Sequence, residues 1–233
     1  MESFLVVIPA RKGSKGVPKK NLKKLNNKPL IAYTIEVAKE CFQGEVICVS
    51  TDDERIVDIA TMYGFPPPFL RPSHLSNDTA PMIDVLKHCV EFYENKGVFF
   101  KSLILLQPTS PFRTSKHVKE ALTLYECEEL EMLVSVKETK ANPYFSLFEE
   151  NQEGFLEKSK KNNFNRRQDV PKVYEYNGAI YIIKIAALKR VDSLSCLTKV
   201  KKYIMSSLSS IDVDNELDWI LTEQIAKYFF SEE

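Results

Sequence analysis

The chain has 233 residues, of which 44% are hydrophobic and 27% are charged, a balance typical of a folded globular protein rather than a disordered or collagen-like one. Its 32 Lys and Arg residues match its 32 Asp and Glu residues, whereas a nucleic-acid-binding protein usually carries a basic excess. No apolar run approaches the ~20 residues of a membrane span, and the five cysteines and three histidines lack zinc-site spacing. We therefore expect a reduced, cytoplasmic protein without nucleic-acid partner, membrane segment or structural metal.

Short apolar segments alternate with amphipathic ones along the first part of the chain. Strands are predicted where aliphatic and β-branched residues run together between turn formers, at 4–9, 45–50, 102–107 and 132–136. Helices are predicted where apolar residues repeat at helical spacing, at 29–42, 53–63, 82–95 and 114–127. Thr114 or Ser115 is the candidate N-cap of the last helix. Continuously apolar strands between helices predict a doubly wound α/β domain with its ligand site beyond the carboxyl ends of the strands.

The segment 138–176 breaks this pattern, because charged and amide residues dominate it. One interpretation is a solvated loop. A connector of roughly 40 residues is long for a compact domain, however, which favours a functional or subunit-bridging arm. Apolar patterns return afterwards and predict strands at 178–185 and 201–206 and a final helix near 215–230. We expect a single domain over 1–233, with 138–176 as an arm within it.

The loop 9–21 concentrates positive charge and glycine between the first strand and the first helix. Gly13 and Gly16 allow the backbone to approach a ligand without a Cβ atom, and consecutive N–H groups in such a turn form an anion-binding concavity. Its five cations are Arg11, Lys12, Lys15, Lys19 and Lys20. The glycine spacing fits neither the P-loop nor the dinucleotide-binding pattern. We interpret the loop as a cradle for phosphates, the alternative being a basic surface turn.

Two aspartates separated by one residue, Asp212 and Asp214, lie near the carboxyl end of the chain. In an extended segment, residues two apart point to the same side, so both carboxylates can address one point. Hard oxygen ligands beside phosphates suit Mg²⁺, which takes few protein carboxylates and keeps its waters. Alternatively, Asp212 is a turn residue and Asp214 caps the final helix; the residues alone favour neither interpretation.

Eight short motifs follow one another along nearly the whole chain. They are A-R-K-G-S-K-G-V-P-K-K-N at 10–21, V-S-T-D at 49–52, L-R-P at 70–72, N-D-T-A at 77–80, L-L-Q-P-T-S-P-F-R at 105–113, R-R-Q-D-V-P at 166–171, N-G-A-I-Y at 177–181 and S-I-D-V-D-N-E-L-D at 210–218. This series resembles the acylneuraminate cytidylyltransferases, also called CMP-sialic acid synthetases. The resemblance implies a homodimer of Rossmann-like domains, each a doubly wound, mostly parallel α/β sheet with a small dimerisation arm.

The resemblance also implies an activity and its residues. The activity is transfer of CMP from CTP to the C2 hydroxyl of a nine-carbon or related 2-keto sugar acid, with release of pyrophosphate and with Mg²⁺ as cofactor. Catalytic roles fall to Arg11, Lys20 and Asp212, and the metal site to Asp212 and Asp214. The implied nucleotide-binding residues are Ala10, Arg11, Gly13, Ser14, Lys20, Asn21, Arg71 and Ala80. The implied sugar-binding residues are Gln107, Arg167, Asn177 and Tyr181.

The chemistry of these residue types supports part of this assignment. Arg71 can donate to the carbonyl and ring nitrogen of cytosine. Gln107 ends a predicted strand, so its amide can project into the ligand crevice and bond sugar hydroxyls. The planar guanidinium of Arg167 suits the carboxylate of a sugar acid. Tyr181, by contrast, is equally well explained as a core aromatic of its strand.

Several positions depart from the pattern of the N-acetylneuraminate enzymes. Glu175 stands where many of them have arginine, residues 142–145 contribute no lysine, and Met82 replaces a small hydroxyl residue. The CTP-binding half is thus the better preserved, and a relative of sialic acid such as legionaminic acid is a plausible acceptor. Two alternatives are a non-catalytic nucleotide-binding module and a nucleotidyltransferase for a sugar 1-phosphate. The presence of both aspartates argues against the first, and the R-K-G-S-K-G opening argues against the second.

Overall fold

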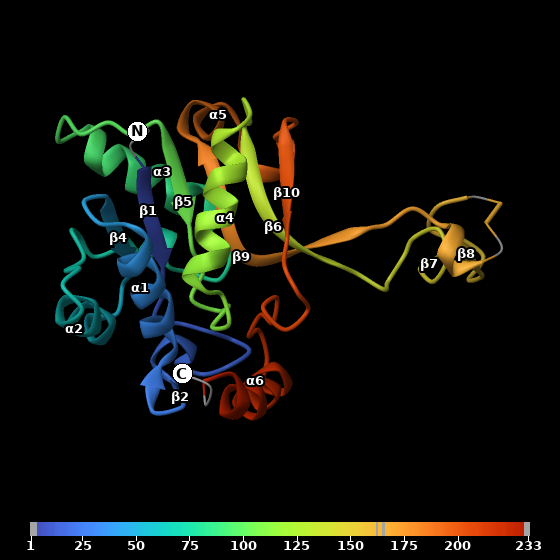
Figure 1. Cartoon of the computed structure of the whole chain (residues 1–233), viewed down its shortest axis with the longest axis horizontal. Helices are drawn as coiled ribbons and strands as arrows, with labels where there is room; N and C mark the ends of the chain where they lie inside the picture. Colours follow the sequence, from blue (N-terminus) through green and yellow to red (C-terminus); the bar gives the residue numbers. More distant parts are fainter. Residues whose placement is uncertain (1–3, 162, 165, 231–233) are drawn as a thin grey trace.

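The computed structural model describes residues 4–161, 163–164 and 166–230. A six-stranded sheet lies at its centre, in the order β10-β6-β9-β5-β1-β4 (Figure 1). Its strands are β1 (Phe4–Pro9), β4 (Val46–Ser50), β5 (Ser102–Leu105), β6 (Met132–Glu138), β9 (Tyr174–Lys184) and β10 (Val200–Ile204). β1 is parallel to β4 and β5, and β6 is parallel to β10. The predicted mostly parallel α/β sheet is confirmed.

β9 runs antiparallel to both of its neighbours, β5 and β6. The sequence predicts this strand, at 178–185, but not its direction. Because β9 runs backwards, it begins at the edge of the sheet at which β5 ends. Asn177 and Gly178 therefore arrive beside the loop that follows β5, at the edge where α/β sheets bind their ligands.

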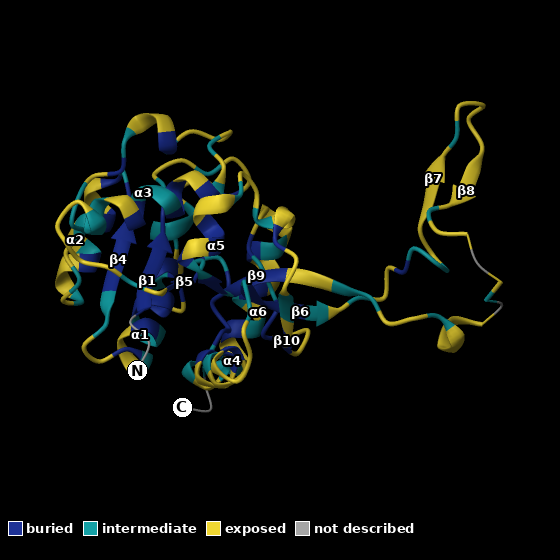
Figure 2. Ribbon diagram, turned by 90° about the horizontal axis from the view of Figure 1, so that it is seen from above, coloured by how far each residue is buried: buried dark blue, intermediate teal, exposed yellow. Residues whose placement is uncertain are grey.

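Helices cover both faces of the sheet. On one face are α1 (Leu30–Cys41), α2 (Glu54–Met62) and α4 (Ser115–Glu126), and on the other are α3 (Met82–Glu94) and α5 (Ile185–Arg190). Alternate residues of β1 point into the two cores, Val6 and Ile8 into one and Leu5 and Val7 into the other, as expected for a strand covered on both faces. In Figure 2, β1 and most of the neighbouring strand β4 are dark blue because they are buried. The four helices predicted before residue 130 form within one residue of their predicted ends, and Thr114 is the N-cap of α4.

The last helix, α6 (Glu216–Phe229), packs against the N-terminal part of the chain. A third apolar cluster joins Trp219 of α6 to Val17 and Leu30. The same N-terminal part contains the 3-10 helix η1 (Lys20–Leu22) and the hairpin of β2 (Lys24–Leu25) and β3 (Lys28–Pro29). This packing brings the C-terminal helix beside the segment that follows β1, at the edge of the sheet opposite the start of β1 (Figure 1).

The body contains two further 3-10 helices, η2 (Ser73–Leu75) and η4 (Leu194–Cys196). Within the described residues, no helix combines the length and the apolar character that crossing a membrane requires.

Between β6 and β9 the chain leaves the body as an arm (Figures 1 and 2). The arm contains β7 (Phe148–Glu150) and β8 (Leu156–Lys158), paired as a hairpin, and the 3-10 helix η3 (Arg167–Asp169). Phe148, Phe155 and Leu156 are 49%, 65% and 70% exposed. A two-stranded hairpin is marginally stable by itself in water. The described part of the chain offers these apolar side chains no second layer.

Candidate active site

A cavity of about 220 Å³ opens at the carboxyl ends of β1 and β5. It is lined by residues from four separate parts of the chain, including Arg11, Gly13, Ser14, Lys20, Asn21, Arg71, Gln107 and Asp214. All eight belong to the residues predicted to bind nucleotide, sugar or metal. The fold therefore gathers residues from both ends of the sequence around one hollow.

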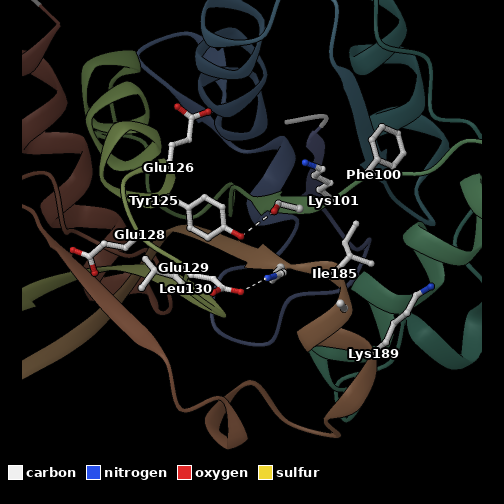
Figure 3. A pocket seen from close by; sticks show the side chains of 12 residues that line it. Phe100, Lys101, Tyr125, Glu126, Glu128, Glu129, Leu130, Ile185 and Lys189 are labelled. Atoms are coloured by element: carbon white, nitrogen blue, oxygen red, sulfur yellow. Dashed lines mark hydrogen bonds and ion pairs between the residues drawn. The ribbon is translucent and has the colours of Figure 1, made fainter. Parts of the chain in front are cut away.

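A larger hollow of about 880 Å³ lies at the opposite edge of the sheet (Figure 3). Charged groups in it are already paired, such as Lys184 with Glu129 at 3.4 Å. A buried hydrogen bond of 2.9 Å joins the hydroxyls of Ser102 and Tyr125 beside it. Ligands of α/β sheets bind at the carboxyl ends of the strands, whereas this hollow lies at the amino end of β5. The smaller cavity is therefore the candidate active site.

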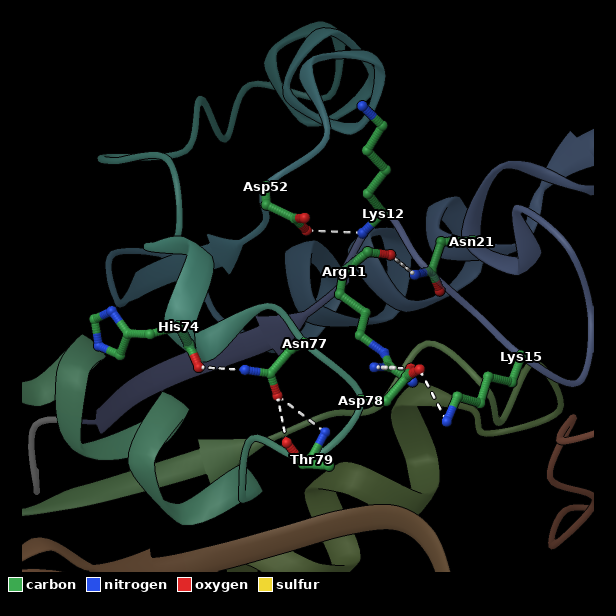
Figure 4. A network of polar contacts seen from close by, with 9 residues as sticks. All are labelled: Arg11, Lys12, Lys15, Asn21, Asp52, His74, Asn77, Asp78 and Thr79. Atoms are coloured by element: carbon green, nitrogen blue, oxygen red, sulfur yellow. Dashed lines mark hydrogen bonds and ion pairs between the residues drawn. The ribbon is translucent and has the colours of Figure 1, made fainter.

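The glycine-rich loop is fixed by polar contacts on both sides (Figure 4). Arg11 Nη1 lies 2.5 Å from Asp78 Oδ1, and Lys15 Nζ lies 3.1 Å from Asp78 Oδ2. Lys15 and Arg11 hold the pKa of Asp78 below its usual value. Asn21 Nδ2 donates to the carbonyl of Arg11 at 3.1 Å, and the backbone N–H of Lys12 donates to Asp52 at 2.7 Å. Two predicted phosphate ligands, Arg11 and Asn21, are thus bonded to each other.

Lys20 connects this loop to the C-terminal aspartates. Its Nζ donates to the carbonyl of Val213 and lies 3.4 Å from Asp214 Oδ1, while its side chain is only 11% exposed. The backbone of Gly16 packs so closely on Asp214 that a Cβ atom there would lie 1.8 Å from the Asp214 carbonyl oxygen. Glycine is required at position 16 by this close approach. The phosphate loop and the Asp212–Asp214 segment are thus in direct contact.

Asp212 lies beside Gly178 and Gln107. Gly178 has a φ of 72°, and a Cβ atom there would lie 3.2 Å from both Asp212 Oδ2 and Gln107 Oε1. Burial raises the pKa of Asp212 to about 6; the negative charge of Asp214 adds to the rise, and Thr109 and Lys20 oppose it. Among the described residues, no hydrogen-bond partner reaches the buried Oδ1 of Asp212.

Asp214 differs from Asp212, because its side chain is 74% exposed. It does not cap the final helix: Asn215 is the N-cap of α6, in a capping box with Asp218. Asp218 also accepts the backbone N–H groups of Asp214 and Asn215, both at 3.0 Å. Among the described residues, no group of three or more His, Cys, Asp or Glu has the arrangement of a metal site. A metal here would have Asp212 and Asp214 as its carboxylate ligands, which suits Mg²⁺.

Arg71 forms one wall of the cavity and is only 6% exposed. Its Nε donates to Ser50 Oγ at 3.0 Å and its Nη2 donates to the carbonyl of Ser50. The same carbonyl accepts the N–H of Ala10 at 2.9 Å. Burial lowers the pKa of Arg71. Ala80 is half-buried and lies two residues before Met82, which lines the cavity.

The four predicted sugar-binding residues are placed differently. Gln107 lines the cavity, and Tyr181 is half-buried on β9, where burial and then Asp212 raise its pKa to about 12. Asn177 is 3% exposed, and its amide is occupied by Ser135 at 2.6 Å and Ser210 at 2.9 Å. It supports the segment leading to Asp212 from inside. Arg167 lies on the arm, outside the cavity of its own chain, and donates to the carbonyl of Lys140 at 3.1 Å.

The sequence by itself indicates no role for Asp78, Ser50 and Thr109, although all three lie in the quoted motifs. Their roles depend on contacts with distant parts of the chain: Asp78 with Arg11, and Ser50 with Arg71. Thr109 accepts the N–H of Val213 through its backbone carbonyl at 2.9 Å. The motifs contain these residues, but the sequence does not show which distant residues they contact.

Comparisons with known proteins identify the family of the chain. Residues 5–219 match the family model described as cytidylyltransferase. The chain is 35% identical over 224 residues to the CMP-N,N′-diacetyllegionaminic acid synthase of Legionella pneumophila, with 95% of each chain covered. It is 37% identical over 220 residues to the N-acylneuraminate cytidylyltransferase of Streptococcus agalactiae, covering 93% of this chain and 51% of that one. The fold is similar to that of a CMP:2-keto-3-deoxy-manno-octonic acid synthetase solved with CTP, with a TM-score of 0.70, 19% identity and coverage of 97% and 99%.

Proposed function

The chain belongs to the cytidylyltransferase family, and on this basis we propose that it transfers CMP from CTP to the C2 hydroxyl of a sialic-acid-like 2-keto sugar acid. One observation supports the proposal most strongly. The cationic loop and the Asp212–Asp214 segment, from opposite ends of the sequence, meet at one cavity. A nucleotidyltransferase needs this juxtaposition, because its transferred phosphate must lie between a phosphate cradle and a carboxylate site.

The cavity walls suit a cytidine triphosphate. Arg11, Lys15 and Lys20 place three cations at or beside the hollow, enough to offset most of the roughly four negative charges of a triphosphate. Incoming phosphates would compete with Asp78 for Arg11 and Lys15. Arg71, held by Ser50, would present its remaining N–H donors to the base.

The reaction needs no covalent intermediate. The C2 oxygen of the acceptor forms a bond to the α-phosphorus while the bond from that phosphorus to the β-phosphate oxygen breaks, and the hydroxyl proton is released. Positioning and charge neutralisation supply most of the rate in such reactions. Arg11 and Lys20 would stabilise the charge that accumulates on the departing pyrophosphate. Gln107 would orient the acceptor beside Asp212.

Asp212 and Asp214 fit a Mg²⁺ ion. Asp212 has a buried oxygen that no described hydrogen-bond donor reaches, and Asp214 presents an exposed carboxylate at the cavity. When bound, the ion supplies positive charge to the phosphate oxygens and lowers the pKa of a coordinated hydroxyl. Lys20 would keep Asp214 in place, through its contacts with that carboxylate and with Val213.

The arm supports a homodimer. Its hairpin exposes Phe155 and Leu156, which a second copy can bury. Arg167 lies on the arm and outside the cavity of its own chain, so we place it in the partner's sugar site. All five cysteines are free thiols, which is consistent with a reducing compartment such as the cytoplasm.

Pyrophosphate release tests the proposal. Each of the four nucleoside triphosphates is combined with N-acetylneuraminic acid, N,N′-diacetyllegionaminic acid, pseudaminic acid and a sugar 1-phosphate. We expect release only with CTP, and fastest with one of the three sugar acids. Release with the sugar 1-phosphate would support a different nucleotidyltransferase. CTP binding without any release would identify a non-catalytic nucleotide-binding module.

A further inference from the structure

Arg113, the last residue of the L-L-Q-P-T-S-P-F-R motif, has no role in the site described above. It is 3% exposed, and within the described residues it forms no ion pair with a carboxylate. Burial lowers its pKa to about 9. Burying a guanidinium without a negative partner is costly. A cation kept in such a place is expected to perform a specific task.

The Arg113 guanidinium donates hydrogen bonds to three acceptors, which lie in the loop after β5, on β9 and on α1. Its Nη1 donates to the carbonyl of Gln107 at 3.0 Å and to the carbonyl of Ala179 at 2.8 Å. Its Nη2 donates to Thr34 Oγ1 on α1 at 2.6 Å. The hydroxyl of Thr34 in turn lies 3.4 Å from the carbonyl of Gln107. Two of the three acceptors are thus backbone groups at the ligand edge of the sheet.

The position of these carbonyls in the strand register is informative. The ladder between β5 and β9 ends at the pair Leu105 and Tyr181. Two residues beyond this pair, in the same register, Gln107 faces Ala179. There the N–H of Ala179 turns to Asn177 Oδ1 at 3.2 Å, and the carbonyls of both residues bond Arg113 instead of continuing the ladder. Arg113 therefore joins the chain just after β5 to the middle of β9, where the pairing between these two strands stops.

We propose that Arg113 is a positioning residue for the acceptor half of the site. By bridging the carbonyls of Gln107 and Ala179, it fixes the spacing between the loop that follows β5 and the middle of β9. At that spacing, Gln107 Oε1 and Asp212 Oδ2 both lie close to Gly178. A Cβ atom at position 178 would be only 3.2 Å from each of the two oxygens. The inference rests on the proposed function in one respect: Gln107 must contact the sugar acid.

The inference predicts a selective defect. Arg113→Met keeps most of the side-chain volume but leaves both carbonyls without their donor, whereas Arg113→Lys keeps a cation that can reach some of the acceptors. With CTP and the best sugar acid, we expect KM for the sugar acid to rise about tenfold or more in Arg113→Met and less in Arg113→Lys, because misplacing a contact group weakens acceptor binding. The Kd for CTP, measured by calorimetry, should change less than about twofold, since Arg113 does not line the cavity.

Ser102→Ala is the matched control. Ser102 lies on the same strand, β5, but at its other end, where its buried hydroxyl bonds Tyr125 at 2.9 Å (Figure 3). Its loss should lower the melting temperature without changing KM for the sugar acid. The proposal is wrong if Ser102→Ala raises that KM as much as Arg113→Met. It is also wrong if the Arg113 variants leave that KM unchanged or weaken CTP binding equally.

Amide hydrogen exchange provides a readout that does not depend on activity or on Arg113→Met folding. In Arg113→Lys, exchange should increase at residues 106–112 and 177–181 and remain unchanged at residues 4–9, whereas Ser102→Ala should leave both ligand-edge segments protected. If the wild-type chain turns over no sugar acid, the proposed function fails. The exchange result would then still decide whether Arg113 joins the segment after β5 to β9.

Discussion

Gly178 lies between the carboxylate of Asp212 and the amide of Gln107, with a φ of 72°. Gly178→Ala places a methyl group 3.2 Å from an oxygen of each. We expect turnover to fall at least about tenfold while CTP binding changes little, since the displaced groups lie on the acceptor side. The added strain should also cost about 1 kcal/mol of stability.

Gly64→Ala separates the effect of backbone strain on stability from the effect of crowding on turnover. Gly64 also has a positive φ, 90°, but a Cβ atom there meets nothing within 4 Å. This variant should lose similar stability and keep full turnover in the pyrophosphate assay. Equal losses of turnover in the two variants would show that backbone strain, rather than the crowding at Gly178, is responsible.

Asp212 is the more buried of the two aspartates and lies beside Gly178. Asp212→Ala should lower turnover by about two orders of magnitude or more, because it removes a charged group at the reacting centre, while the Kd for CTP stays within about threefold. Glu216→Gln is the control: Glu216 is the first residue of α6 and pairs with Lys23 at 3.2 Å. Full pyrophosphate release by Asp212→Ala would overturn the assignment.

At the scale of single residues, the sequence could identify the cavity residues but not their supports. Arg11, Lys20 and Gln107 follow from motif chemistry at strand ends, and the structure places all three at one cavity. Asp78 and Arg113 follow from no local pattern, because each acts through partners that only the fold brings near. The same reason explains why the two alternatives for Asp214 stayed open until the helix cap was seen to be Asn215.

Among the elements, helices were easier to predict than the arm strands. The helices have apolar stripes, and α2 and α4 also begin after the capping residues Asp53 and Thr114. β7 and β8 are exposed throughout, so neither shows the alternation that identifies a strand. The direction of β9 depends on how the arm returns to the body, and no periodicity in residues 178–185 encodes it.

Glu131 holds the segment that leads into the edge strand β10. Glu131 Oε2 accepts the backbone N–H groups of Thr198 at 2.8 Å and Lys199 at 3.1 Å, and Oε1 lies 2.5 Å from Arg190. The N–H groups of Thr198 and Lys199, followed by Arg190, lower the pKa of this carboxyl from 4.5 to about 2. A carboxyl with a lowered folded-state pKa stabilises the fold above its unfolded pKa, and that contribution is lost as the pH falls towards the folded value.

Glu131→Gln should therefore lower the melting temperature at neutral pH and flatten its decline between about pH 5 and about pH 2.5. The wild-type and variant curves should approach each other at the acidic end, as the pH nears the folded-state pKa of the wild-type carboxyl. Glu150→Gln, on the exposed strand β7, should follow the wild-type curve throughout. Parallel wild-type and Glu131→Gln curves over this range would contradict the assignment.

At the scale of the whole molecule, the arm and the body are built differently. The body buries continuous cores on both faces of its sheet, whereas the arm exposes large hydrophobic side chains such as Phe155 and Leu156. Arg167 lies on this arm and outside the cavity of its own chain. A dimer in which each arm reaches the other subunit would bury the exposed hairpin and deliver Arg167 to a sugar site.

Mixed dimers test this arrangement. Chains carrying Arg167→Ala and chains carrying Asp212→Ala are given different affinity tags, co-expressed and purified through both tags. If Arg167 acts across the interface, one of the two sites in each mixed dimer has both residues intact, so about half of the wild-type activity should return. If Arg167 acts within its own chain, every site is defective and no activity should return.

Pairing Asp212→Ala with Asp214→Ala is the control that must stay inactive, since the proposal assigns both aspartates to the same site of one chain. Failure of the two tags to co-purify would refute the dimer itself.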